Sequence, residues 1–341
     1  MQAHPISAGW IGLADPLASR FNRSGLGRTA PVAGGPLLER GTLRVELAQA
    51  GALMGAEVVA LAAKRPWPFA LTLRIGAEGA VSIGLGTAQA HAAAQVAGVI
   101  GAETGRVTVT YLWDAPARCG WLCVEDHGRG VVRTAAVANP PPVTAAWAEK
   151  AAYQAPVAGA AYLAIADRPS AIGPRPTLAP HTMIETPTGE RPVNALSSGD
   201  LIVTVSGRVS EIRATGWADL PARGICRAMG VPARPFGRDG HALLAAGQRI
   251  AVPPILAGGR TGVVVPAETL VGSGVAEPAA QRPLIRRYHH LLLDRVETFR
   301  AGGIPVESID ARALDADPVA RRLSILGASR SVPRKGGQQA A

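Results

Sequence analysis

Short runs of alternating hydrophobic and polar residues dominate the first half of the chain after residue 38. Gly, Pro or Asp separates seven such runs, at 41–48, 57–62, 68–75, 80–84, 106–113, 120–125 and 130–136. Val107, Val109 and Tyr111 recur at every second position, which places them on one face of a strand. Closely spaced strands of this kind predict an antiparallel β-sandwich. A helix is the competing prediction for the Ala-rich segment 87–99.

Changes in composition divide the chain into five predicted parts. These are a flexible arm at 1–37, the sandwich at 38–138, a proline-rich linker with short elements at 139–175, a second β domain at 176–311 and a basic tail at 312–341. Within the linker we expect a short helix at 144–153 and a strand at 161–166, and within the tail a helix at 318–326. A chain of 341 residues is long enough for two hydrophobic cores.

Composition and charge limit the functional classes. Hydrophobic residues make up 48% of the chain and charged residues 18%, with 40 Gly and 28 Pro, which is typical of strands joined by turns. The net charge is +10, but the arginines are scattered and aromatics are only 4%, so we do not expect specific nucleic-acid binding. We expect no membrane span and no classical signal peptide, which leaves the compartment unknown, with a cytoplasmic and a non-classically secreted protein both compatible with the sequence. We expect no cofactor, and the sequence is compatible with a protein partner but does not identify one.

The three cysteines do not form a recognisable metal or disulfide pattern. Cys119 and Cys123, with His127, give the spacing C-x3-C-x3-H, but a second distant ligand pair is missing, and Cys226 stands alone. We therefore predict buried core thiols and no metal site. The side chains that we expect to line the sandwich interior are Tyr111, Trp113, Trp121, Cys119 and Cys123.

A strand–turn–strand pattern opens the second β domain. Residues 182–204 read T-M-I-E-T-P-T-G-E-R-P-V-N-A-L-S-S-G-D-L-I-V-T, with a strand at 182–186, a turn at 187–189 and a new strand after Gly199. This segment resembles the opening of a bacterial Hint domain, the hedgehog/intein module, with its G-T-x-I-x-T-P-x-G-x-R-P-V-x-x-L-x-x-G-D. Further framework matches follow in the family order at 263–272 and 301–308. The resemblance implies a compact all-β Hint fold.

The resemblance also implies a self-processing chemistry. In the family, a Cys, Ser or Thr attacks the carbonyl that precedes it, and histidine and aspartate residues orient the groups and transfer protons. Thr177 matches the position of the family cysteine, and Gln248 matches that of a histidine. His290 and Asp294 match the family motif Y-x-H-L-L-x-D-x-H-E, in which Val296 replaces the second histidine. These matches predict that Thr177 and Gln248 approach each other near the centre of the domain, at an eroded catalytic site.

Three functions are compatible with this pattern. The first is a degenerate, non-cleaving Hint protein with a structural or interaction role, and hence not an enzyme. The second is an active autoprocessing module that breaks the bond between Pro176 and Thr177 by an N-to-O acyl shift. The third is an adhesive or carbohydrate-binding protein, because the segment 106–122 resembles the lectin-like, laminin-G-type sandwiches found ahead of some bacterial Hint modules.

Overall fold

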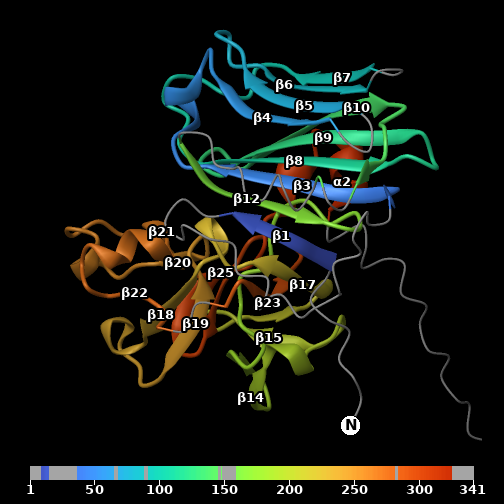
Figure 1. Cartoon of the computed structure of the whole chain (residues 1–341). Coiled ribbons are helices and arrows are strands. Elements are labelled where there is room, and N and C mark those ends of the chain that lie inside the picture. The colour runs from blue at the N-terminus through green and yellow to red at the C-terminus, as the bar shows by residue number, and fades with distance from the viewer. Residues whose placement is uncertain are drawn as a thin grey trace, which may run out of the picture.

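Two β domains, one stacked on the other, make up the described part of the chain (Figure 1). The computed structural model describes residues 9–14, 37–64, 68–87, 91–144, 147, 159–280 and 283–324. The N-terminal domain is a sandwich of two antiparallel sheets, and the C-terminal domain is built from four sheets of two to six strands. The prediction of a mainly β protein with an N-terminal sandwich is confirmed. No helix in these ranges is long and apolar enough to cross a membrane.

The sandwich consists of a six-stranded sheet and a four-stranded sheet. In spatial order, the larger sheet contains β1 (Trp10–Ala14), β12 (Ala160–Ala166), β3 (Arg40–Leu47), β8 (Val107–Asp114), β9 (Cys119–Asp126) and β10 (Val131–Ala138). The smaller sheet contains β4 (Glu57–Ala63), β5 (Phe69–Ile75), β6 (Val81–Thr87) and β7 (His91–Val96). A short pair, β2 (Leu37–Leu38) and β11 (Val143–Thr144), lies beside them.

Most of the predicted elements of the sandwich are present. All seven predicted strands are confirmed, but the helix predicted over 87–99 is wrong, because its described part forms β7, which pairs with β6. Ala92 and Val96 of β7 are buried against the sandwich core, so packing outweighs the helix propensity of alanine. Within that segment, residues 88–90 lie outside the described residues.

Two strands of the larger sheet lie outside the predicted range of the sandwich. β1 comes from the predicted arm and β12 from the predicted linker, and the two pair with each other in the order β1-β12-β3. The predicted strand at 161–166 is thus confirmed as part of the sandwich. The helix predicted at 144–153 lies mostly outside the described residues, and the helix expected at 318–326 appears as α2 (Pro318–Leu323).

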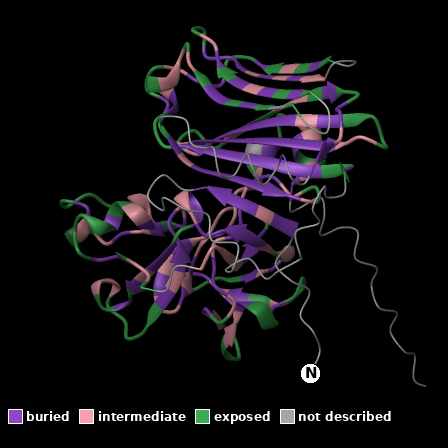
Figure 2. Ribbon diagram, viewed as in Figure 1, coloured by how far each residue is buried: buried purple, intermediate pink, exposed green. Residues whose placement is uncertain are grey.

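The larger sheet is buried on both faces (Figure 2). Its inner face carries apolar residues such as Leu43, Val45 and Leu163, which form the sandwich core with the smaller sheet. Its outer face carries polar residues, among them Arg44 and Glu46, which are nonetheless fully buried because the C-terminal domain covers them. The boundary between the domains is therefore a buried polar layer.

The aromatic and cysteine residues divide between these two faces. Tyr111 and Trp113 lie in the sandwich core, with their rings stacked at a centroid distance of 5.5 Å. Trp121 and Cys123 point to the outer face, where they pack against C-terminal segments, and Cys119 is exposed. The predicted interior position is thus wrong for these three residues. Among the described residues, no group of His, Cys, Asp and Glu could hold a metal ion.

In its described residues the C-terminal domain contains one six-stranded sheet, one three-stranded sheet and two two-stranded sheets. Their strands are β13 (Met183–Thr186), β14 (Gly189–Pro192), β15 (Leu201–Val203), β16 (Val209–Glu211), β17 (Ala214–Pro221), β18 (Ala228–Pro232), β19 (His241–Ala245), β20 (Arg249–Ala251), β21 (Val264–Pro266), β22 (Glu277–Pro278), β23 (Ile285–Leu292), β24 (Thr298–Ala301) and β25 (Ile304–Glu307). Short 3-10 helices in this part of the chain occupy Val193–Ala195, Gly224–Cys226, Arg234–Phe236, Pro254–Leu256, Ala267–Val271 and Ala311–Leu314, and another, Ala50–Leu53, lies in the sandwich. A separate hydrophobic core, which includes Ile184, Leu244 and Phe299, holds these sheets together.

The chain enters and leaves the C-terminal domain at neighbouring points. Ile172, before the domain, forms a parallel bridge with Ser324, after it, and the Ile172 amide donates to the Leu323 carbonyl at 3.2 Å. The helix α2 lies beside the larger sheet, where Asp317 accepts hydrogen bonds from the amide and hydroxyl of Thr134, both at 2.7 Å. The final described segment therefore packs back onto the sandwich.

We predict that Trp113→Ala lowers the free energy of unfolding by about 3–5 kcal/mol, because it removes a large buried ring from the core. Its matched control is Trp217→Ala, since the Trp217 side chain is half exposed and meets chiefly the Arg287 guanidinium stacked on its ring. The control should cost less than about 1 kcal/mol. Urea denaturation measures both values, and equal losses would contradict this description of the core.

Candidate functional site

Thr177 is fixed by its main chain at the centre of the C-terminal domain. Its amide donates to the His289 carbonyl at 3.1 Å, and its carbonyl accepts from the Ala245 amide at 2.8 Å. The next residue, Leu178, bridges to both Leu244 and His289. Thr177 thus lies between β19 and β23, which carry the two other matched motifs.

The side chain of Gln248 directly meets that of Thr177. The Thr177 hydroxyl donates a hydrogen bond to Gln248 Oε1, and Gln248 is buried. Gln248 Nε2 donates to the carbonyls of Arg249 at 2.9 Å and Glu307 at 3.0 Å, which fixes the orientation of the amide. The predicted approach of Thr177 and Gln248 is confirmed. An amide oxygen accepts this hydrogen bond but does not take up a proton at neutral pH.

His290 lies in β23 and faces the same cavity as Thr177 and Gln248. It is buried, and in the described part of the chain neither ring nitrogen has a hydrogen-bond partner. Burial, with a smaller contribution from His289, lowers the pKa of His290 to about 4. The imidazole is therefore neutral at physiological pH.

Asp294 lies away from this group. Its carboxylate pairs in a fork with the guanidinium of Arg213, through Nε and, at 3.0 Å, Nη2, on the exposed surface. The hydrogen bond from Arg213 lowers the pKa of Asp294. Asp294 lines a second cavity, with a volume of about 940 Å³, and neither Thr177 nor His290 lines that cavity. Because β23 ends at Leu292, the strand alternation that would place His290 and Asp294 on one face does not extend to Asp294.

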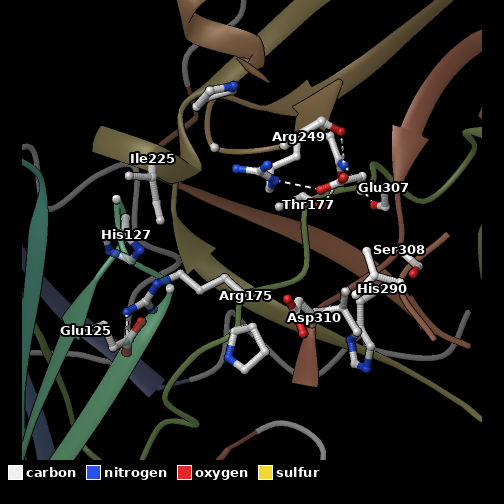
Figure 3. Close-up of a pocket in the computed structure, with 18 of the residues that line it drawn as sticks. Glu125, His127, Arg175, Thr177, Ile225, Arg249, His290, Glu307, Ser308 and Asp310 are labelled. Atoms are coloured by element: carbon white, nitrogen blue, oxygen red, sulfur yellow. Dashed lines mark hydrogen bonds and ion pairs between the residues drawn. The ribbon is translucent and has the colours of Figure 1, made fainter. Parts of the chain in front are cut away.

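The cavity beside Thr177 is formed by both domains and has a volume of about 560 Å³. The turn between β9 and β10, including His127 and Arg129, forms its wall on the sandwich side. Figure 3 shows Arg175 extending from the segment before Thr177 toward Glu125 and His127. No sequence motif indicated that the sandwich contributes to this site, because the relation between the domains depends on contacts far apart in the chain.

A buried ion pair anchors the segment that leads into Thr177. Arg175 Nη2 donates to Glu125 Oε1 at 2.8 Å, and the Gly173 amide donates to the same oxygen at 3.0 Å. Burial alone would raise the pKa of Glu125, but the guanidinium of Arg175 and other nearby cationic groups outweigh this effect and lower it. Both members of the pair are therefore charged, and because both side chains are almost fully buried, each depends on the other for compensation of its charge.

A second charged group joins the domains. Arg106, from the sandwich, donates to Glu46 Oε1 at 2.5 Å and to Glu268 of the C-terminal domain at 3.1 Å. The amide of Ile225 donates to both Glu46 oxygens, at 3.0 and 3.2 Å. Burial nevertheless raises the pKa of Glu46 to about 6, despite the opposing effect of Arg106.

Comparison with known proteins identifies the C-terminal domain. Residues 176–312 match the family model of the Hint domain. Solved structures similar to this chain include the MchDnaB-1 intein, with 15% identity over 38% of this chain and 98% of its own and a TM-score of 0.28. A bacterial intein-like domain from Clostridium thermocellum has 15% identity over 40% of this chain and 99% of its own, also with a TM-score of 0.28.

One comparison spans both domains. The binding domain of botulinum neurotoxin DC, solved in complex with rat synaptotagmin II, has 8% identity over 83% of this chain and 81% of its own, with a TM-score of 0.23. This likeness is too low to support an argument. No curated protein sequence matches the chain. The family match and the ordered framework motifs define residues 176–312 as a Hint domain, and the protein as a Hint domain-containing protein with an N-terminal β-sandwich.

We predict that His290 titrates near pH 4 in the folded protein. Because the pKa of His290 is lower in the folded protein than in the unfolded chain, its contribution to the free energy of unfolding is present at higher pH. This contribution is lost as the pH falls from about 6.5 through about 4. Histidine ring signals in an NMR titration measure this directly, and His290→Gln assigns the signal. A midpoint near 6.5 would show that the ring is exposed to water.

Glu46 should show the opposite dependence. Its folded pKa is raised from 4.5 to about 6, so its contribution is fully present below about pH 4.5 and is lost as the pH rises through 6. The free energy of unfolding of the unmodified protein, minus that of Glu46→Gln, should fall by about 2 kcal/mol across this window. Denaturation of both proteins at pH 4 and pH 7 measures this difference. The effects of other titrating groups are the same in both proteins and therefore cancel. A difference that stays constant or rises would contradict it.

Proposed function

We propose that this protein is a non-cleaving relative of self-processing Hint proteins, in which the Hint domain serves as a structural or interaction unit. The observation that carries the proposal is the hydrogen bond from the Thr177 hydroxyl to the amide oxygen of Gln248. Thr177, Gln248 and His290 line one cavity, whereas Asp294 lies outside it, and the chemistry of these side chains is unsuited to the first step of processing.

The attacking group is the first weakness. A threonine hydroxyl ionises far above neutral pH, whereas a thiol supplies a useful fraction of thiolate. A hydroxyl therefore needs a neighbouring base to become a nucleophile. Its partner here is Gln248, whose amide hydrogens are already donated to the carbonyls of Arg249 and Glu307.

Proton transfer is the second weakness. His290 has a lowered pKa and is neutral at physiological pH, so it is a weak proton acceptor and cannot donate as an imidazolium. Asp294 is held on the surface by Arg213 and does not line the cavity beside Thr177. General acid–base assistance typically contributes about 10²–10⁴-fold to such a reaction. Without it, the acyl shift would be very slow.

The residue before Thr177 also opposes cleavage. Pro176 is buried, and its ring fixes its own backbone angle φ, which restricts the conformation of the residue just before the bond that would break. Arg175 is held in turn by its ion pair with Glu125. These contacts support a scaffold role, in which the segment is fixed rather than presented for reaction. Carbohydrate binding by the sandwich stays a prediction from the sequence.

The unmodified protein should remain intact during hours of incubation at neutral pH, with or without added thiol or hydroxylamine. An ester formed at Thr177 would be cut by hydroxylamine, which makes the test sensitive to a slow acyl shift. Intact mass spectrometry is the measurement. A fragment with the mass expected for cleavage between Pro176 and Thr177 would overturn the proposal and favour the active autoprocessing alternative.

Restoring the missing groups should restore reactivity. We expect Thr177→Cys combined with Gln248→His to produce thiol-dependent cleavage before position 177, because the two side chains already touch. Adding His290→Ala should slow this cleavage at least tenfold if the neutral imidazole assists proton transfer. Adding Asp294→Ala should leave the rate unchanged, since its carboxylate lies in the other cavity. A slower rate with Asp294→Ala would place Asp294 in the site after all.

A further inference from the structure

We propose that the sandwich and the Hint domain form one non-covalent unit that does not depend on the peptide chain joining them. A break in the linker, whether natural or engineered, would leave an associated pair of fragments and would not release the sandwich. This inference is independent of whether Thr177 reacts. It follows from the contacts that the outer face of the larger sheet makes with everything that comes after residue 168.

The linker segment after residue 168 is itself bound to the sheet. The Ser170 amide donates to the Thr42 hydroxyl at 2.8 Å, and Arg44 Nη2 donates to the Ala171 carbonyl at 2.9 Å. Farther along, Gly173 and Arg175 both contact Glu125. The segment therefore remains attached at several points to strands β3 and β9, even without its covalent connection to β12.

Buried charges are shared between the two sides. Glu46 and Arg106 belong to the sandwich, and their remaining partners, the Ile225 amide and Glu268, belong to the Hint domain. Separation would expose Glu46, which is fully buried, and would break the ion pair of Arg175 with Glu125. Removing one member of a buried pair leaves an uncompensated charge, which makes partial opening of the interface costly.

Apolar contacts surround these charges. Cys123 and Val132 of the sandwich pack with Ile172, Leu314 and Ala320 in one cluster that excludes water. In a second cluster, Trp10 and Leu13 pack with partly buried residues at the start of β23. The Trp10 indole also donates to the Asp219 carbonyl at 2.8 Å. Apolar area around desolvated polar contacts is the arrangement found at stable protein interfaces.

Gly224 shows how closely the surfaces fit. It has a φ of +53°, and a Cβ atom at this position would lie 1.9 Å from a carboxylate oxygen of Glu46. Even alanine is therefore excluded unless the interface shifts. Gly237 offers a matched comparison in the same domain, because its φ is +74° and a Cβ atom there would meet nothing within 4 Å.

The experiment introduces a cut into the full chain. A recognition sequence for a specific protease is inserted between Arg168 and Pro169, which are both exposed. After complete cleavage, shown on a denaturing gel, the mixture is analysed at micromolar concentration by size-exclusion chromatography with light scattering. We expect both fragments to elute together at the mass of the uncut protein. Separate elution of two folded fragments would overturn the proposal.

The glycine variants test whether this particular interface is responsible. Gly224→Ala should weaken the association of the cut fragments by about tenfold to a hundredfold, the range expected for overpacking a well-fitted contact. Gly237→Ala carries the same backbone strain and should leave the association unchanged. Equal weakening by both variants would show that strain within the Hint domain, and not the contact with Glu46, holds the fragments together.

A second measurement needs no insertion. Calorimetry of the uncut protein should show one cooperative unfolding transition if each domain depends on the other, and Gly224→Ala should broaden or divide it. Two independent transitions in the unmodified protein, with midpoints that Gly224→Ala does not change, would overturn the proposal. This result does not depend on whether the protein with the inserted sequence folds.

Discussion

The charged residues on the outer face of the larger sheet determine much of this structure. A sheet that buries an apolar face in a sandwich ordinarily leaves its polar face in water. Here Arg44, Glu46 and Glu125 on that face are buried, and their compensation comes partly from the linker and the Hint domain. Because ionised groups are costly to bury without partners, the position of one domain fixes that of the other. The cavity beside Thr177 is a product of this arrangement.

Thr177 and Gln248 meet at the centre of the Hint domain through their side chains, and the main-chain amide and carbonyl of Thr177 both form hydrogen bonds. Gln248 also has a structural role, because its amide group donates to two carbonyl groups. A side chain that satisfies buried carbonyls stabilises the centre of the domain whatever its catalytic capacity.

Local patterns predicted most of the strands, since alternation and turn residues act over a few positions. They did not predict β7, where an Ala-rich segment takes the form dictated by its neighbour β6. They also placed Cys123 on the wrong face of its sheet, because β9 is buried on both faces and alternation alone does not show which face points into the sandwich core. For the site, ordered motifs identified the meeting of Thr177 with Gln248. The contributions of Glu125 and His127 depend on the packing of two domains, which no short pattern encodes.

The bridge between Ile172 and Ser324 brings the two ends of the Hint domain together. Both ends lie next to each other beside the sandwich, so the chain enters and leaves the domain at one place. The flanking segments would therefore remain adjacent if the domain were shortened, exchanged or removed. A domain with adjacent ends is also easily transplanted, because a recipient protein needs only one exposed turn to accommodate it.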